Sequence, residues 1–165
     1  MLLSNRRKIL AGFGALSITA ACGFSPVYGT NGAGRALRGA VRADDPVSRA
    51  DFQFGSAFED LLGRPNGARY ALAYTITQTE VEAGDIQNIG ATRVQLFGTL
   101  DFVLTDMNTG SEVATGQVAN NTTYSTTSTQ LATLTAAEDA ELRLMRILAE
   151  ALTTRLYTEP GLAPA

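Results

Sequence analysis

Apolar and polar residues alternate along three stretches of the chain. In residues 69–81, Leu72, Tyr74 and Ile76 fall on one side, and threonines fall on the other. Residues 92–105 alternate in the same way, and residues 112–124 follow after a turn that ends at Gly110. A period of two is typical of strands that bury one face, so we predict a three-stranded meander with one face open to solvent. The residues predicted on that open face include Thr75, Thr77, Thr79, Arg93, Gln95, Thr99 and Asp101.

Two other stretches repeat their apolar residues at helical spacing. Phe54, Phe58, Leu61 and Leu62 predict a helix that ends at Gly63. A second helix is predicted to begin with a capping box at Thr135 and Glu138 and to run to about Tyr157. Its expected apolar stripe consists of Leu142, Met145, Leu148, Ala149, Leu152 and Leu156.

The remaining stretches complete the predicted organisation. Residues 37–41 form a weak strand candidate, glycine-rich residues 22–36 predict a flexible tether, and the Thr- and Ser-rich residues 121–133 predict a mobile loop. The order β-α-β-β-β-α predicts an α/β (α+β) two-layer sandwich, in which two helices cover one face of a four-stranded mixed sheet. We expect a single domain over residues 37–158 and a C-terminal tail over 159–165.

The N-terminus has the layout of a cleavable secretory signal. Basic residues 6–8 precede a short apolar run over 9–18, and small residues up to Ala21 lead to Cys22. The run is shorter than the roughly 20 residues that a membrane-spanning helix needs. A small-residue site that ends at a cysteine resembles the bacterial lipobox, although Thr19 stands where leucine is usual. This resemblance implies cleavage of residues 1–21 after Ala21 and lipidation of Cys22; the alternative is an ordinary secreted protein with a buried free cysteine.

Composition narrows the functional classes. Without residues 1–21, the chain keeps ten arginines and sixteen acidic residues, a net charge of −6, which disfavours nucleic acid as a partner. The chain has no histidine and a single cysteine, which removes Ser-His and Cys-His nucleophiles and thiolate metal sites. We therefore expect no enzyme, no cofactor and no metal. The competing interpretation is an enzyme that uses the carboxylates Glu80, Glu82 and Asp85, which are more typical of solvated surface charges.

Residues 22–29 read Cys-Gly-Phe-Ser-Pro-Val-Tyr-Gly. This octapeptide resembles the start of the mature lipopolysaccharide-assembly lipoproteins, the LptE family, with Val27 in place of the usual leucine. The chain length, the element order and the long C-terminal helix agree with that family. The resemblance implies a two-layer sandwich, anchored by lipid in the outer membrane, that plugs the large β-barrel LptD, helps it assemble and assists lipopolysaccharide delivery without catalysis. Gly23, where aspartate would signal inner-membrane retention, favours export to the outer membrane.

Two arginines are candidate contacts for lipopolysaccharide phosphates, because a guanidinium binds phosphate through two hydrogen bonds at once. Arg93 follows the hairpin loop predicted over residues 84–90, and Arg69 lies near the start of the preceding strand. The competing interpretation of Arg93 is a solvated side chain at a strand end. The alternative function is that of an accessory lipoprotein in a periplasmic lipid transporter or secretion complex.

Overall fold

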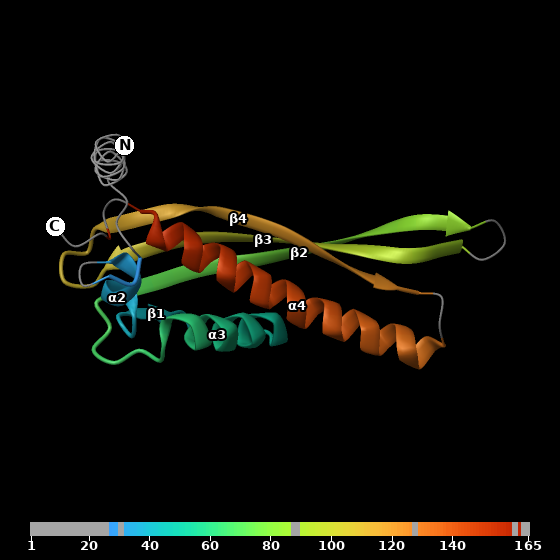
Figure 1. Ribbon diagram of the computed structural model, residues 1–165, viewed down its shortest axis with the longest axis horizontal. Coiled ribbons are helices and arrows are strands. Elements are labelled where there is room, and N and C mark those ends of the chain that lie inside the picture. Colours follow the sequence, from blue (N-terminus) through green and yellow to red (C-terminus); the bar gives the residue numbers. More distant parts are fainter. Residues whose placement is uncertain (1–26, 30–31, 87–89, 127–128, 160–161, 163–165) are drawn as a thin grey trace, which may run out of the picture.

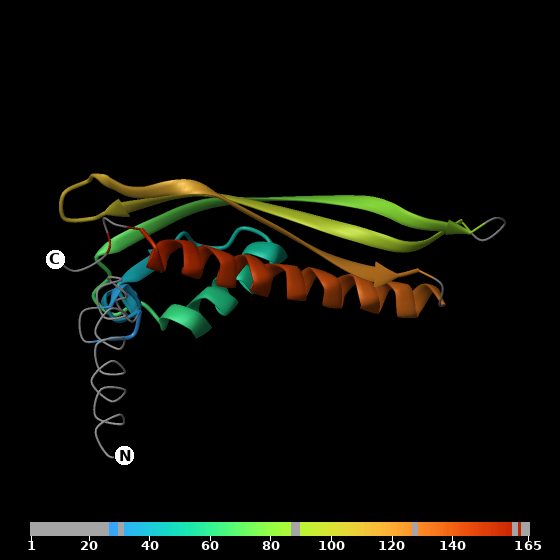
Figure 2. The ribbon, with the colours of Figure 1, turned by 45° about the horizontal axis from the view of Figure 1, so that its top comes forward.

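A four-stranded sheet with helices packed on one face makes up the fold, as the sequence predicted (Figure 1 and Figure 2). The computed structural model describes residues 27–29, 32–86, 90–126, 129–159 and 162. Its elements are α2 (Ala33–Leu37), β1 (Val41–Ala43), α3 (Arg49–Leu62), β2 (Tyr70–Ile86), β3 (Gly90–Asp106), β4 (Glu112–Ser125) and α4 (Gln130–Tyr157).

The strands follow one another across the sheet in chain order, β1-β2-β3-β4. β1 runs parallel to β2, while the β2–β3 and β3–β4 pairs are antiparallel, so the predicted mixed sheet is confirmed. The register places Ile76 beside Leu100, and Leu100 beside Val118. Because side chains alternate between the faces of a strand, this register gathers the apolar residues on the face that the helices cover.

Helix α3 begins and ends as its local sequence directs. Ser48 caps the N-terminus: its hydroxyl accepts from the Asp51 backbone N–H, and the Asp51 carboxylate accepts from the Ser48 N–H. Gly63 ends the helix with a φ of 81°, a conformation that suits glycine. Phe54 is fully buried and packs against the ring of Tyr74 at 4.7 Å between centroids. Leu61, predicted for the core, is instead 38% exposed.

Helix α4 spans 28 residues and crosses the sheet diagonally (Figure 1). Its apolar stripe is confirmed except at Leu142, which lies at the margin of the stripe and is 41% exposed. The close approach of α4 to β3 depends on Gly98, where a Cβ atom would lie 2.9 Å from Leu144 Cδ2. The buried residues of α4 are Ala140, Leu144, Met145, Leu148, Ala149, Leu152, Thr153 and Leu156.

The predicted loop over residues 121–133 is wrong over most of its length. β4 continues to Ser125, with Thr122 paired to Leu96 and Tyr124 paired to Val94. The tract has few apolar residues, but its β-branched threonines fit a pleated sheet, which a count of hydrophobic positions overlooks. The predicted capping box is also wrong: Thr129 caps α4, and Thr135 lies inside the helix, where its hydroxyl donates to the Leu131 carbonyl at 3.1 Å.

Three smaller boundaries also differ from the prediction. The strand expected over residues 37–41 is β1 at Val41–Ala43, because Ala33–Leu37 form the short helix α2 where a tether was expected. β2 extends through Ile86 and β3 begins at Gly90, so the loop predicted over residues 84–90 is shorter than expected. Residues 87–89 lie outside the described residues. Leu162, predicted to belong to a tail, is buried in the core.

Candidate functional site: the uncovered face of the sheet

The face of the sheet opposite the helices carries no helix in the described part of the chain (Figure 2). The side chains on this uncovered face come from alternate residues of β2, β3 and β4, and most are Thr, Gln, Asn or Ala. All seven residues predicted there share it, and each is exposed or partly exposed. The face therefore offers many hydrogen-bonding groups and little apolar area, which lets it remain in water without a partner.

Charge on the uncovered face is sparse. From residue 71 to 83 of β2, 93 to 105 of β3 and 115 to 125 of β4, its charged side chains are Arg93 and Asp101. Gln117 Nε2 donates to Asp101 Oδ1 at 2.7 Å, so this carboxylate is held in place by a neutral neighbour. Val81 and Phe97 are the exposed large apolar residues of the face.

A shallow hollow of about 630 Å³ crosses the uncovered face from Asp44, just after β1, to β4. The hollow contains two carboxylates, Asp44 and Asp101, and neither forms an ion pair with a described residue. None of the described residues that line it is basic. Its lining residues are Asp44, Ala73, Tyr74, Thr75, Asp101, Phe102, Val103, Thr115, Gly116 and Gln117.

The two candidate arginines lie far apart. Arg93 is exposed on the uncovered face, opposite Ala83 of β2, and forms no ion pair with any described residue. Arg69 precedes the first residue of β2, fourteen positions before Ala83, which separates the arginines by about 45 Å at roughly 3.3 Å per residue. The structure therefore does not bring them into one site.

Arg69 is bound to a buried carboxylate. Its Nε and Nη2 atoms donate to Asp106 Oδ2 at 3.0 and 2.9 Å, and its guanidinium lies over the ring of Tyr70. The Asn108 N–H donates to Asp106 Oδ1 at 2.9 Å, and this bond, followed by Arg69, holds the pKa of Asp106 below its ordinary value. Arg69 thus fastens the β3–β4 turn to the start of β2.

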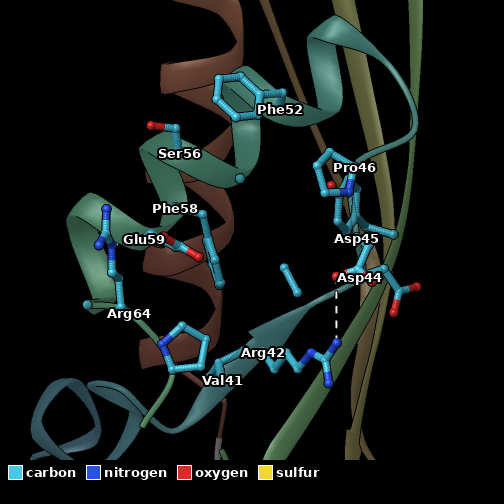
Figure 3. A pocket seen from close by; sticks show the side chains of 15 residues that line it. Val41, Arg42, Asp44, Asp45, Pro46, Phe52, Ser56, Phe58, Glu59 and Arg64 are labelled. Carbon is cyan, nitrogen blue, oxygen red and sulfur yellow. Dashed lines mark ion pairs between the residues drawn. The ribbon is translucent and has the colours of Figure 1, made fainter.

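A second and deeper groove, of about 700 Å³, lies between β1 and α3 (Figure 3). Pro46, Phe52 and Phe58 form apolar parts of its wall. The ion pairs Arg42–Asp45 at 3.6 Å and Arg64–Glu59 at 3.7 Å lie along its rim.

Tyr74 also lines this groove. Burial, with the nearby Asp51 and Asp44 carboxylates, raises the pKa of Tyr74 to about 12, so its hydroxyl stays protonated at neutral pH. No local sequence pattern signals the groove, because its walls come from an edge strand and a helix that only the fold places together.

Two of the three carboxylates of the competing enzyme interpretation, Glu80 and Glu82, have described side chains. Glu80 and Glu82 are exposed on the helix side of β2, where the Tyr124 hydroxyl donates to Glu80 Oε1 at 3.2 Å. The side chain of Asp85 lies outside the described part. Among the residues that the structure describes, no group of three His, Cys, Asp or Glu side chains could hold a metal ion. The predicted cleavage site at Ala21 and the lipidation site at Cys22 also lie outside the described residues.

The fold thus defines the class as a two-layer α+β sandwich that leaves one face of a four-stranded mixed sheet uncovered. Solved structures of other proteins share it. A protein from Caulobacter crescentus described as a lipoprotein aligns with a TM-score of 0.63 at 22% identity, over 76% of this chain and 93% of its own. Rare lipoprotein B from Shewanella oneidensis aligns with a TM-score of 0.56 at 14% identity, over 74% of this chain and 96% of its own. Uncharacterized lipoprotein B from Nitrosomonas europaea aligns with a TM-score of 0.53 at 9% identity, over 74% of this chain and 84% of its own.

These likenesses show a shared fold, and the three proteins named here are described as lipoproteins. No family model and no curated protein matches the sequence. The described residues contain no helix that is both long enough and apolar enough to cross a bilayer.

Proposed function

We propose that this protein is an outer-membrane lipoprotein of the lipopolysaccharide-assembly machinery. In this proposal Cys22 carries the lipid anchor, and the folded domain occupies the lumen of a large β-barrel, LptD, which it helps to assemble. The protein assists delivery of lipopolysaccharide to the cell surface and catalyses no reaction. The octapeptide at residues 22–29 supports the family, and the fold is one that occurs in proteins named as lipoproteins.

The observation that carries the proposal is the uncovered face of the sheet. Barrel lumens of this size are largely polar, so a plug needs a surface rich in hydrogen-bonding groups. The uncovered face offers such a surface from Ala71 to Ser125 with few charges and few large apolar groups. Affinity for the barrel should then be spread over many modest polar contacts, and single surface substitutions should be tolerated.

The anchor at Cys22 would hold the protein at the membrane by hydrophobic burial. One acyl chain gives marginal binding, whereas two or three chains, each worth about 0.8 kcal/mol per buried CH₂, hold stably. Mass spectrometry of the mature N-terminus tests this directly, with Cys22→Ser as the comparison. We expect an acylated Cys22 and an unprocessed or unlipidated variant; an unmodified thiol on Cys22 would overturn the anchor.

Within this proposal, Arg93 is the better candidate for lipopolysaccharide contact. Its guanidinium is exposed and has no acidic partner among the described residues, so both of its donor edges can face phosphate. Arg69 is less suited, because two of its nitrogens already bind Asp106. Arg93→Ala should therefore weaken crosslinking to lipopolysaccharide more than Arg69→Ala does, provided that the Arg69 variant remains folded.

Depletion of the protein tests the proposal in the cell. We expect less correctly assembled barrel in outer-membrane fractions and greater sensitivity to large hydrophobic antibiotics. Wild-type protein supplied from a plasmid should restore both, and Cys22→Ser should not. Normal barrel abundance with an intact permeability barrier would contradict the proposal. If the anchored protein instead co-purifies with a periplasmic lipid transporter or a secretion complex, the accessory-lipoprotein alternative gains the support.

A further inference from the structure

The two edges of the sheet differ in length and protection. β1 forms one edge over three residues, with Arg42 within it and Asp44, Asp45 and Pro46 directly after it. β4 forms the other edge over fourteen residues. From Val113 to Ser125, β4 contains no charged residue and no proline. Proteins commonly protect exposed edges with charges, prolines or very short strands, and the Val113–Ser125 part of β4 has none of these.

The hydrogen bonding of β4 leaves a defined run of its backbone free. In an antiparallel pair, alternate residues bond to the neighbouring strand and the others point away from it. The bond from Thr126 N to Thr92 O fixes the even-numbered residues of β4 as the ones that bond to β3. The odd-numbered residues Thr115, Gln117, Ala119 and Asn121 then direct their N–H and C=O groups to the edge, and all four are exposed.

The ends of this free run are also set by the structure. Beyond it, the Thr123 carbonyl accepts from Arg143 Nη2 of α4 at 3.4 Å. Between Thr115 and Asn121, no described residue bonds to the outward backbone groups. β4 therefore presents the edge of a sheet that is ready to pair with one more strand of about seven residues.

We propose that the free edge of β4 accepts an extended segment of another polypeptide as a fifth strand, and that this segment presents a basic side chain to the uncovered face. Strand addition draws its affinity from main-chain hydrogen bonds and its selectivity from side-chain sites beside the edge. The hollow on the uncovered face supplies the side-chain site. Thr115, Gly116 and Gln117 form its β4 side, and Asp101 lies one strand further in. The proposal goes beyond the barrel function and does not require the partner to be the barrel.

A second copy of this chain fits the edge less well. An antiparallel pair of β4 strands centred on Val118 would place Ala119 and Asn121 of the second copy beside Gln117 and Thr115. These side chains carry no charge, so the carboxylates of Asp44 and Asp101 would remain without a cation. A different polypeptide with arginine or lysine at that position would bring a cation to Asp101, which lies two strands from it at roughly 4.8 Å per strand.

Fluorescence anisotropy with the full-length protein in detergent tests the proposal. The probe is a labelled nine-residue peptide that alternates threonine with valine and carries arginine at its centre. One comparison peptide carries glutamate at the centre, and another is N-methylated at alternate residues so that it cannot donate its main-chain hydrogen bonds. The edge variants are Ala119→Pro and Ala119→Lys. The matched control is Thr77→Lys, because Thr77 lies in the same row of the sheet but two strands from the edge.

We expect saturable binding of the arginine peptide that weakens at least about tenfold, or roughly 1.4 kcal/mol, in Ala119→Pro and with the N-methylated peptide. Ala119→Lys should also weaken it, and Thr77→Lys should stay within about twofold of wild type. Asp101→Asn should reduce the preference for arginine over glutamate.

Equal binding by wild type and both edge variants would overturn the proposal, as would equal binding of the N-methylated peptide or the absence of saturable binding. Self-association that Ala119→Pro abolishes would assign the edge to a second copy and would also overturn it. None of these results bears on barrel abundance after depletion, so the two proposals can fail separately.

Discussion

The two ends of the β2–β3 ribbon are built differently. At the end near β1, the helix-side positions of both strands are apolar, as in the buried pair Leu72 and Leu104. Toward the tip, β2 places Gln78, Glu80 and Glu82 on that side, and α3 does not extend under it (Figure 1). β2 therefore contributes to the core at one end and is polar on its helix side at the other, whereas β3 still buries Leu96 and Val94 opposite Glu80 and Glu82. We expect stability to depend more on the first end than on the second.

The largest expected contrast comes from one aspartate placed in each region. Leu152→Asp places an unpaired charge at a fully buried position. It should lower the free energy of unfolding by more than about 4 kcal/mol and abolish cooperative folding. Thr79→Asp, on the exposed face of the ribbon, serves as the control and should melt like wild type. Circular dichroism melts of the full-length protein in detergent measure both. Equal melting temperatures for the two variants would remove the distinction between the ends.

A smaller contrast compares two glycines. Gly98→Val places its Cβ 2.9 Å from Leu144 Cδ2 and 3.1 Å from Leu148 Cδ1. We therefore expect overpacking to lower the free energy of unfolding by about 1–3 kcal/mol. At Gly55, inside α3, a Cβ meets nothing within 4 Å, and Gly55→Ala should stabilise by about 0.5–1 kcal/mol through helix propensity. Chemical denaturation reports both changes. The close approach of α4 to β3 would be in doubt if both substitutions proved stabilising.

A pH-dependent contrast separates Asp106 from the exposed carboxylates. The pKa of Asp106 is lowered in the folded protein, chiefly by the Asn108 N–H and then by Arg69. Its ionised form therefore favours folding above the ordinary value of 3.8, and the gain is lost as the pH falls through the lowered pKa. Asp106→Asn should lower the melting temperature at pH 7, and the gap to wild type should narrow as the medium becomes strongly acidic. A gap that is constant with pH would exclude the ionised pair as its cause.

The smallest expected effect is at the tip of the ribbon. Arg93→Ala removes an exposed side chain without an acidic partner among the described residues, so the free energy of unfolding should change by less than about 0.5 kcal/mol. Arg69→Ala is the companion variant and should destabilise more, because it leaves the buried Asp106 carboxylate without its cation. A larger loss for Arg93→Ala than for Arg69→Ala would contradict these assigned roles.

The sequence predicted the layers of this fold because its strands and helices each carry one apolar face. Leu72, Leu100 and Phe102 alternate clearly enough to fix the buried side of the sheet, and Gly63 marks a helix end by its conformational freedom. The polar residues of the uncovered face followed from the same alternation.

The parts that could not be predicted depend on contacts between distant segments. The Thr-rich end of β4 is a strand because β3 pairs with it, and Leu142 is exposed because no neighbouring element covers it. The ion pair between Arg69 and Asp106 joins residues 37 positions apart, and no local pattern signals it. The hollow on the uncovered face arises from residues of β2, β3 and β4 together with Asp44 just after β1, so it too appears only once the sheet has formed.

The position of the first described residues shows which end of the domain would lie near the proposed lipid anchor. The hydroxyls of Tyr28 and Tyr157 lie 3.4 Å apart, so the chain enters the domain beside the end of α4 (Figure 1). The ribbon tip lies at the opposite end, and the 17 residues of β2 cover about 50 Å at roughly 3.3 Å each. With Cys22 only six residues before Tyr28, lipidation would hold one end of the domain close to the bilayer. The tip of the hairpin would then lie farther from the anchored end than the roughly 30 Å thickness of the hydrocarbon layer.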